Sequence, residues 1–221
     1  MKKLFAFCFV ISSAFSLDCY AQTDVDVDYF PGYRQAICVV PQYAVISGIR
    51  IDYERKISSR NQWLVFSPQY YSNSNGYSGY HDMTGTGLNV FYKQYLWQAD
   101  RKNGHDHSRS KLYFSAGPTF QYFSLLSIEE VPEEFTENGI TYIQFHSEEV
   151  PTRIYKLGLN VDFGYQVTLN RFILDFYLGI GMRHALDENG EKMDDLNDDW
   201  LDYGYSGALM DGGVRLGFLL K

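Results

Sequence analysis

The sequence predicts an all-β protein, an eight-stranded antiparallel up-and-down transmembrane β-barrel that follows a cleavable signal peptide. Three observations support this prediction. The chain opens with a charged and then apolar leader. Period-2 segments, in which apolar and polar residues alternate, recur along the rest of the chain. Short and long connections between these segments alternate, as periplasmic turns and external loops do in membrane barrels.

Residues 1–21 have the features of a signal peptide. Two lysines precede an apolar run over residues 4–17, which is shorter than the roughly 20 residues that a membrane-spanning helix needs. The tripeptide CYA at 19–21 then provides a small-x-small cleavage site. We therefore expect a signal peptide at 1–21, a periplasmic lead-in at 22–32 and the barrel at 33–221.

Composition narrows the classes of protein further. Cleavage would remove Cys8 and Cys19 and leave Cys38 alone, so we expect no disulfide framework in the exported domain. The formal net charge of −8 argues against non-specific binding of nucleic acid. Mean hydropathy is −0.28, which a membrane barrel shares with soluble proteins because only half of each strand faces lipid.

The expected strands, in chain order, are 33–40, 43–57, 62–71, 86–96, 111–123, 155–166, 171–184 and 205–221. The first has the weakest alternation and ends at a turn formed by Pro41 and Gln42, whereas the turn SSRN joins the second to the third. The fourth and fifth place leucine, valine and aromatic residues on one phase. In the sixth, YKLGLNVDFGYQ, every odd residue is apolar or aromatic, and every even residue is polar or glycine. The seventh and eighth repeat this pattern, which gives the even number that a closed membrane barrel requires.

The connections between these strands fall into two classes. The short or modest ones are 58–61, 97–110 and 167–170, and the long ones are 72–85, 124–150 and 185–204. With both termini in the periplasm, all the long connections lie outside the cell. This asymmetry is typical of membrane barrels.

The residues of the polar phase indicate whether the polar or the apolar face of the sheet points into the barrel. A soluble lipocalin-like barrel would bury the apolar phase around a ligand, and a membrane barrel would turn it outward. Glycines are frequent on the polar phase. They are a poor choice on an exposed strand, but inside a narrow lumen they make room for an Arg or Lys from across the barrel. We therefore expect a plugged lumen with a salt-bridge network of Arg50, Asp52, Glu54, Lys56, Lys93, Lys156, Asp162, Asp175, Arg183 and Arg215.

The apolar phase is expected to face lipid, because it carries almost no charge in mid-strand. Aromatic residues near strand ends would form interfacial girdles, namely Tyr53, Tyr92, Tyr122, Tyr155, Tyr165 and Phe172. Pro68 and Pro118 each remove a ladder hydrogen bond, so we expect them at bulges or strand ends.

The stretches GIRIDYERKI, GTGLNVFYKQYL and YKLGLNVDFGYQ are similar to those of small outer-membrane β-barrels. Over roughly 33–221, the chain resembles barrels of the OmpA/OmpX type, although the resemblance is a pattern without an invariant motif. It implies an outer-membrane location and contact with outer-membrane lipid, lipopolysaccharide and the barrel-assembly machinery. One departure is the C-terminus, where Phe218 is followed by three further residues and not by the chain end.

Two of the expected external loops are strongly acidic. Residues 124–150 contain seven glutamates and no Lys or Arg, and residues 185–204 contain eight acidic residues and one lysine. Carboxylate clusters suit divalent cations, which also bridge lipopolysaccharide, so divalent cations are candidate partners at these loops. A solvated, repulsive loop is the preferred interpretation.

Residues that could carry catalysis are scarce. The sequence contains no P-loop, GxSxG, HExxH or CxxC motif. The HDH stretch at 105–107 offers two histidine ligands in a turn, which would make only a weak metal site.

Three functions remain open at this stage. His184 would act as a general base in a lipid-modifying barrel enzyme if Ser206 and Asp187 or Glu188 were placed beside it. A soluble periplasmic ligand carrier is the other alternative. The preferred prediction is a non-enzymatic outer-membrane protein without a cofactor, with a plugged charged lumen and a structural or surface-interaction role.

Overall fold

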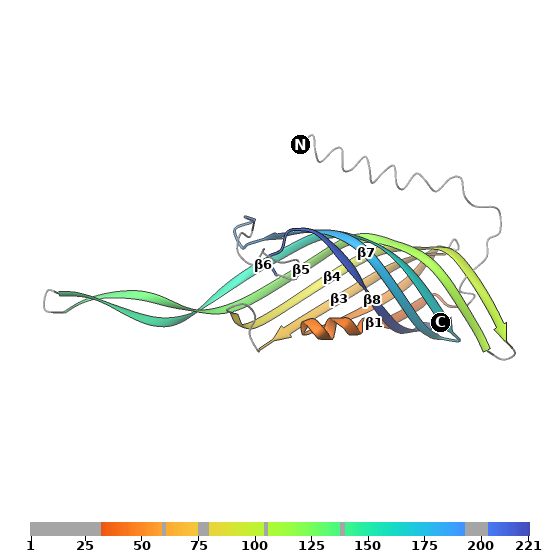
Figure 1. The fold of residues 1–221 in the computed structure, drawn as a ribbon, viewed down its shortest axis with the longest axis horizontal. Helices are drawn as coiled ribbons and strands as arrows, with labels where there is room; N and C mark the ends of the chain where they lie inside the picture. Colours follow the sequence, from red (N-terminus) through yellow and green to blue (C-terminus); the bar gives the residue numbers. More distant parts are fainter. Residues whose placement is uncertain (1–31, 59–60, 75–79, 104–105, 138–139, 193–202) are drawn as a thin grey trace, which may run out of the picture.

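The computed structural model describes residues 32–58, 61–74, 80–103, 106–137, 140–192 and 203–221. Eight antiparallel strands form one closed barrel, in which each strand pairs with its neighbours in the chain and the first pairs with the last (Figure 1). The prediction of an eight-stranded antiparallel barrel is confirmed. The expected signal peptide and nearly all of the lead-in lie outside the described residues.

The elements follow one another without crossovers. They are β1 (Gln35–Val39), the 3-10 helix η2 (Pro41–Ile46), β2 (Gly48–Ser58), β3 (Gln62–Asn73), β4 (Tyr80–Asn103), β5 (Asp106–Glu137), β6 (Ile140–Leu169), β7 (Phe172–Leu186) and β8 (Gly207–Leu220). The turns that connect β2 to β3 and β6 to β7 each contain an asparagine with a positive φ, Asn61 at 61° and Asn170 at 55°. Asparagine tolerates this left-handed conformation better than most residues.

The segment 124–150, which was expected to be a loop, is a continuation of β5 and β6. Residues 128–137 and 140–149 pair with each other from Ile128–Glu149 to Glu137–Ile140, and together we call them the ribbon. The ribbon projects well beyond the rest of the barrel (Figure 1). The sequence carries the Asn-Gly dipeptide at 138–139, which is the strongest short-range indication of a β-hairpin.

The N-terminal end of the barrel also differs from the prediction. A 3-10 helix replaces both the expected turn at Pro41 and the start of the next strand, and Ser47, with φ of 54°, ends this helix. β1 is therefore short, and its pairing with β8 stops at Val39–Leu216. Where this pairing ends, β8 lies next to η2 in place of β1. We call this junction between β8 and η2 the seam. There the Gln42 Nε2 donates to the Tyr177 hydroxyl at 3.0 Å, and its Oε1 accepts from the backbone N–H of Val214 at 3.4 Å.

Both prolines lie inside strands, so the prediction of bulges or strand ends is wrong. Pro68 pairs with Leu88 on one side, and Pro118 pairs with Leu159. On the side of the other neighbouring strand, the pairing is interrupted for two residues and then resumes in the same register. For Pro68, the interruption lies between the pairs Arg50–Gln69 and Tyr53–Phe66. A proline lacks one N–H, and the ladder loses hydrogen bonds on that side without an inserted residue.

Burial follows the alternation of the sequence. Along β6, Leu157, Leu159 and Val161 are 46%, 39% and 41% exposed, whereas the intervening Asn160 is 1% exposed. The apolar phase therefore points away from the barrel axis, which is the reverse of a soluble calyx. No helix among the described residues has the length and apolar character needed to cross a membrane.

Inward-facing glycines make room for aromatic rings. A Cβ on Gly164 would collide with the ring of Tyr113, its direct partner on the neighbouring strand, and a Cβ on Gly85 would collide with the ring of Phe123. The expected occupants were long basic side chains from across the lumen. At these positions the space is filled instead by an aromatic neighbour one strand away.

Candidate functional site: an ion network inside the barrel

The barrel interior holds a cluster of ion pairs contributed by five strands. It joins seven of the ten residues that the sequence analysis assigned to the lumen, all at most 1% exposed: Arg50, Asp52, Glu54, Lys93, Asp162, Asp175 and Arg215. We call this set the ion network. Alternation brings these residues to one face of their strands, and closure of the sheet brings the strands together.

Arg215 on β8 is the centre of the network. Its guanidinium lies 3.3 Å from the Asp52 carboxylate and 3.8 Å from that of Asp162. It also lies 3.9 Å from Glu54 and 3.8 Å from Asp175. One cation is thus shared by four carboxylates, which come from three other strands.

The two other cations make closer pairs. Arg50 holds Asp52 in a bidentate arrangement, with Nε–Oδ1 at 2.7 Å and Nη2–Oδ2 at 3.0 Å. Lys93 Nζ lies 2.9 Å from Glu54 Oε1 and 3.4 Å from Asp175 Oδ2. Buried charges are tolerated only with such partners, and the bidentate geometry also fixes the guanidinium orientation.

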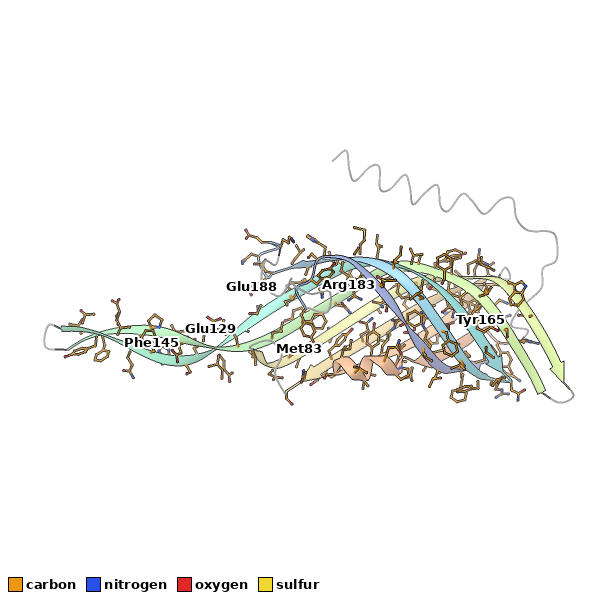
Figure 2. All side chains as sticks on the ribbon, viewed as in Figure 1. Met83, Glu129, Phe145, Tyr165, Arg183 and Glu188 are labelled. Atoms are coloured by element: carbon orange, nitrogen blue, oxygen red, sulfur yellow. The ribbon has the colours of Figure 1, made fainter. Side chains whose placement is uncertain are left out.

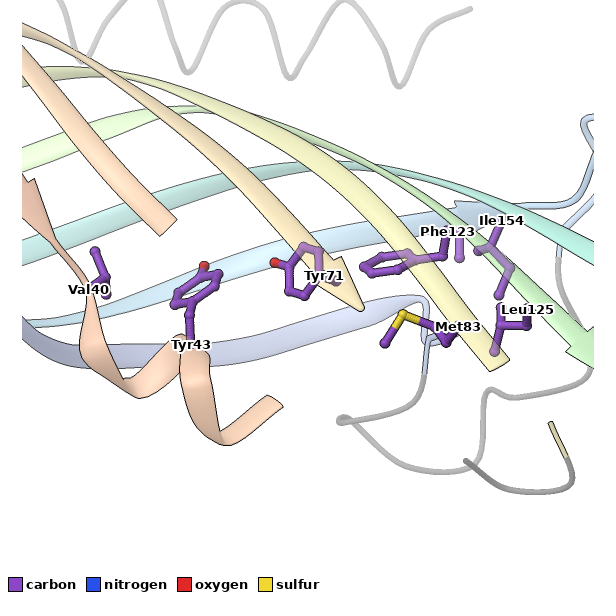
Figure 3. Packing of buried hydrophobic residues seen from close by; sticks show 8 residues of the cluster. Val40, Tyr43, Tyr71, Met83, Phe123, Leu125 and Ile154 are labelled. Atoms are coloured by element: carbon purple, nitrogen blue, oxygen red, sulfur yellow. The ribbon is translucent and has the colours of Figure 1, made fainter. Parts of the chain in front are cut away.

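Two apolar clusters cover the ion network, one at each end of the barrel. The ribbon-end plug comprises Val40, Tyr43, Tyr71, Met83, Phe123, Leu125, Ile154 and Ala185 (Figure 3). The opposite plug comprises Ala36, Cys38, Trp63, Tyr95, Tyr113, Ile173 and Leu219. The charged residues are therefore separated from solvent along the axis by packed aromatic and aliphatic side chains.

Several polar residues of the barrel interior were not predicted from the sequence. The hydroxyl of Tyr113 donates to Asp175 at 2.7 Å, and that of Tyr95 donates to Gln166 at 2.7 Å. Lys93 Nζ lies 4.1 Å from the Tyr113 ring centroid, within the range of a cation–π contact. These residues share the inward phase of their strands with the charged residues. Alternation could therefore have found them, but attention to charge alone did not.

Three of the assigned cations lie apart from the ion network. Lys156 is buried near the ribbon-end plug, with its Nζ 5.9 Å from the Phe123 ring centroid. Lys56 and Arg183 are only half-buried. Both lie on the inward phase of their strands, as does Lys156.

The candidate catalytic group around His184 is not assembled. His184 is exposed on the outward face, where it pairs with Leu157. The hydroxyl of Ser206 accepts from the backbone N–H of Ala185 at 2.8 Å, and Glu188 lies 3.5 Å from Arg153. The structure does not bring these groups to His184.

The other predicted ligand groups fall mainly on residues that the structure does not describe. The side chains of the HDH stretch are not described, and residues 193–202 of the acidic segment 185–204 lie outside the described residues. Asp187 closes a turn by accepting from the backbone N–H of Glu191 at 2.7 Å and of Asn189 at 2.9 Å. Within the described part of the chain, no three His, Cys, Asp or Glu side chains gather as metal ligands.

Fold and interior together define a class: a closed eight-stranded barrel with an apolar exterior and a plugged, ionic interior. Comparisons with protein-family models, curated proteins and solved structures give no match to this chain.

Proposed function

We propose that this chain is a non-enzymatic outer-membrane β-barrel protein, inserted in the lipid bilayer through its outward apolar face, with a structural or surface-interaction role. One observation carries the proposal: apolar side chains are exposed around the barrel, while the charged side chains are buried inside it. Burying the ion network is unfavourable for a protein whose apolar surface stays in water. In a bilayer, the same distribution is favourable.

The dimensions of the barrel fit a bilayer. Tyr122 and Tyr155 pack with ring centroids 5.2 Å apart where the ribbon leaves the barrel, and Phe172 and Phe218 pack 5.5 Å apart at the opposite end. Along β6, the outward residues run from Tyr155 to Tyr165. A tilted transmembrane strand needs about 9–11 residues, so these aromatic pairs lie where interfacial girdles would be expected.

The remaining features follow from this placement. Residues 1–21 would direct export, and the resemblance to OmpA/OmpX-type barrels implies insertion by the barrel-assembly machinery. The two plugs would prevent solute flow. The ribbon would extend outside the membrane, where it presents carboxylates such as Glu129 beside exposed aromatic residues such as Phe145 (Figure 2).

A charged substitution on the outward face tests the proposal. Leu159→Arg should cost about 2–4 kcal/mol if its side chain lies near the bilayer midplane. We expect the variant to lose the heat-modifiable gel mobility of a folded barrel in membrane fractions. Ile143→Arg is the matched control, because Ile143 is 59% exposed on the ribbon, and it should leave the mobility unchanged. Equal behaviour of the two variants would contradict insertion.

A further inference from the structure

Asp162 and Asp211 occupy neighbouring positions on the inner surface of the barrel. Asp162 on β6 pairs with Gly179 on β7, and Gly179 in turn pairs with Asp211 on β8. Directly paired residues project from the same face of a sheet. Both carboxylates therefore lean over the glycine, which has no side chain to separate them.

Two buried oxygens at this place accept no hydrogen bond, namely Asp162 Oδ1 and Asn160 Oδ1. Both residues are 1% exposed. A Cβ on Gly179 would collide with Asp162 Oδ1, and a Cβ on Gly181 with Asn160 Oδ1, so each oxygen lies over a glycine, in space that a larger residue would fill. Orphaned buried acceptors are rare in folded proteins and indicate a missing partner.

Three other polar atoms of this group are engaged. Asp162 Oδ2 accepts from the Ser115 hydroxyl at 3.3 Å and lies 3.8 Å from Arg215. Asn160 Nδ2 donates to Asp211 Oδ2 at 3.2 Å. The amide of Asn160 thus connects the two carboxylates and still presents an unused carbonyl oxygen.

Positive charge is sparse beside Asp162 and Asp211. Of the cations in the ion network, only Arg215 pairs with Asp162, at 3.8 Å, and the buried Lys111 and Lys156 lie on other parts of the inner surface. Arg215 is shared among four carboxylates and forms no ion pair with Asp211. Two carboxylates that share a site require a counter-charge or a proton.

We propose that Asp162, Asp211 and Asn160 bind one Ca²⁺ ion inside the barrel. All the available atoms are oxygens, which hard cations prefer, and a cation between them offsets the repulsion between the neighbouring carboxylates of Asp162 and Asp211. Ca²⁺ accepts six to eight oxygens in flexible geometry, whereas Mg²⁺ demands a near-ideal octahedron. An irregular group of carboxylate and amide oxygens, completed by water, suits Ca²⁺ better.

The seam provides a path to this site. Asp211 is only half-buried, and it lies on the part of β8 that β1 does not cover. The amide of Gln42 borders this opening through its contacts with Tyr177 and Val214. Entry of an ion requires displacement of this side chain, without separation of any strand pair.

Calcium-dependent stability in detergent micelles tests the proposal without reference to membrane insertion. After chelation, added Ca²⁺ should raise the thermal midpoint of the wild-type barrel by several degrees, since a ligand that binds only the folded state stabilises it. Asp211→Asn should abolish this rise, and it should itself raise the midpoint in calcium-free buffer because it removes the repulsion between two neighbouring carboxylates. The control variant replaces Glu130, Glu133 and Glu134 of the ribbon by Gln and should keep the rise.

Tb³⁺ luminescence provides a second measurement on the unaltered protein. Excitation of tyrosine should sensitise one bound Tb³⁺, because Tyr177 lies on the inward face two residues from Gly179, and Ca²⁺ should displace the ion. A calcium response that survives Asp211→Asn, disappears in the ribbon variant, or is reproduced equally by Mg²⁺ would overturn the proposal. Absence of any response in the wild type would also overturn it.

Discussion

At the scale of single residues, the interior is held by charges that depend on one another. Arg215 is 0% exposed and contacts four carboxylates. A buried ion pair contributes little relative to an apolar pair, but removal of one partner leaves an uncompensated charge. The loss of any one charge from the ion network should therefore destabilise the barrel more than the net contribution of a single ion pair would suggest.

Arg215→Met should consequently destabilise the folded barrel by about 3–5 kcal/mol. The matched control is Arg153→Met, because Arg153 forms an exposed pair with Glu188 at 3.5 Å, and exposed pairs contribute at most about 1 kcal/mol. Urea unfolding of both variants in the same micelles measures the difference. Similar midpoints would show that the ion network contributes no more than a surface pair.

Asp187 lies outside the barrel wall, and its pKa is lowered mainly because it accepts from the backbone N–H of Glu191, with further bonds from Asn189. A carboxylate with a lowered pKa stabilises the turn above its unfolded value of about 3.9. This stabilisation is lost as pH falls through the lower, folded value. Its side-chain NMR titration should therefore give a lower midpoint than Asp in a reference peptide. A midpoint at or above the peptide value would be inconsistent with this turn.

At the scale of elements, alternation clearly predicted seven of the eight strands and predicted the first only weakly, and YKLGLNVDFGYQ falls inside β6. The bounds were less predictable. Strand pairing continues past the expected ends in the ribbon, where many charged residues suggested a loop, and also between β4 and β5 over most of the expected connection 97–110. η2 was also missed, since Val45 fits the apolar phase of a strand although it is 86% exposed on this helix. The alternation within one segment does not indicate where the neighbouring strand ends.

The ribbon should be dispensable for folding of the barrel. Its residues 128–137 and 140–149 pair only with each other among the described strands. Replacement of residues 128–149 by a two-residue turn should keep heat-modifiable mobility, and the change in unfolding free energy should stay within about 1 kcal/mol. Loss of the folded form would show that the ribbon contributes to barrel assembly.

At the scale of the whole molecule, the sequence predicted which face of each strand points inward but not how the interior is filled. The charged residues were identifiable from their phase. The aromatic plugs were not, because residues such as Trp63 and Phe123 are inward-facing yet apolar. Which residues meet across the lumen depends on stagger between strands, and this quantity is absent from the alternation of any one strand.

Accessibility of a nitroxide at position 159 tests the central claim most directly. In a Cys38→Ala background, Leu159→Cys would carry the spin label in the barrel wall, and Ile143→Cys would carry it on the ribbon, because both native side chains are exposed. In proteoliposomes, we predict that molecular oxygen relaxes the label at 159 and that a water-soluble nickel chelate does not. At 143 the nickel chelate should relax the label strongly. Strong relaxation by the nickel chelate at 159 would contradict an outward face in contact with lipid.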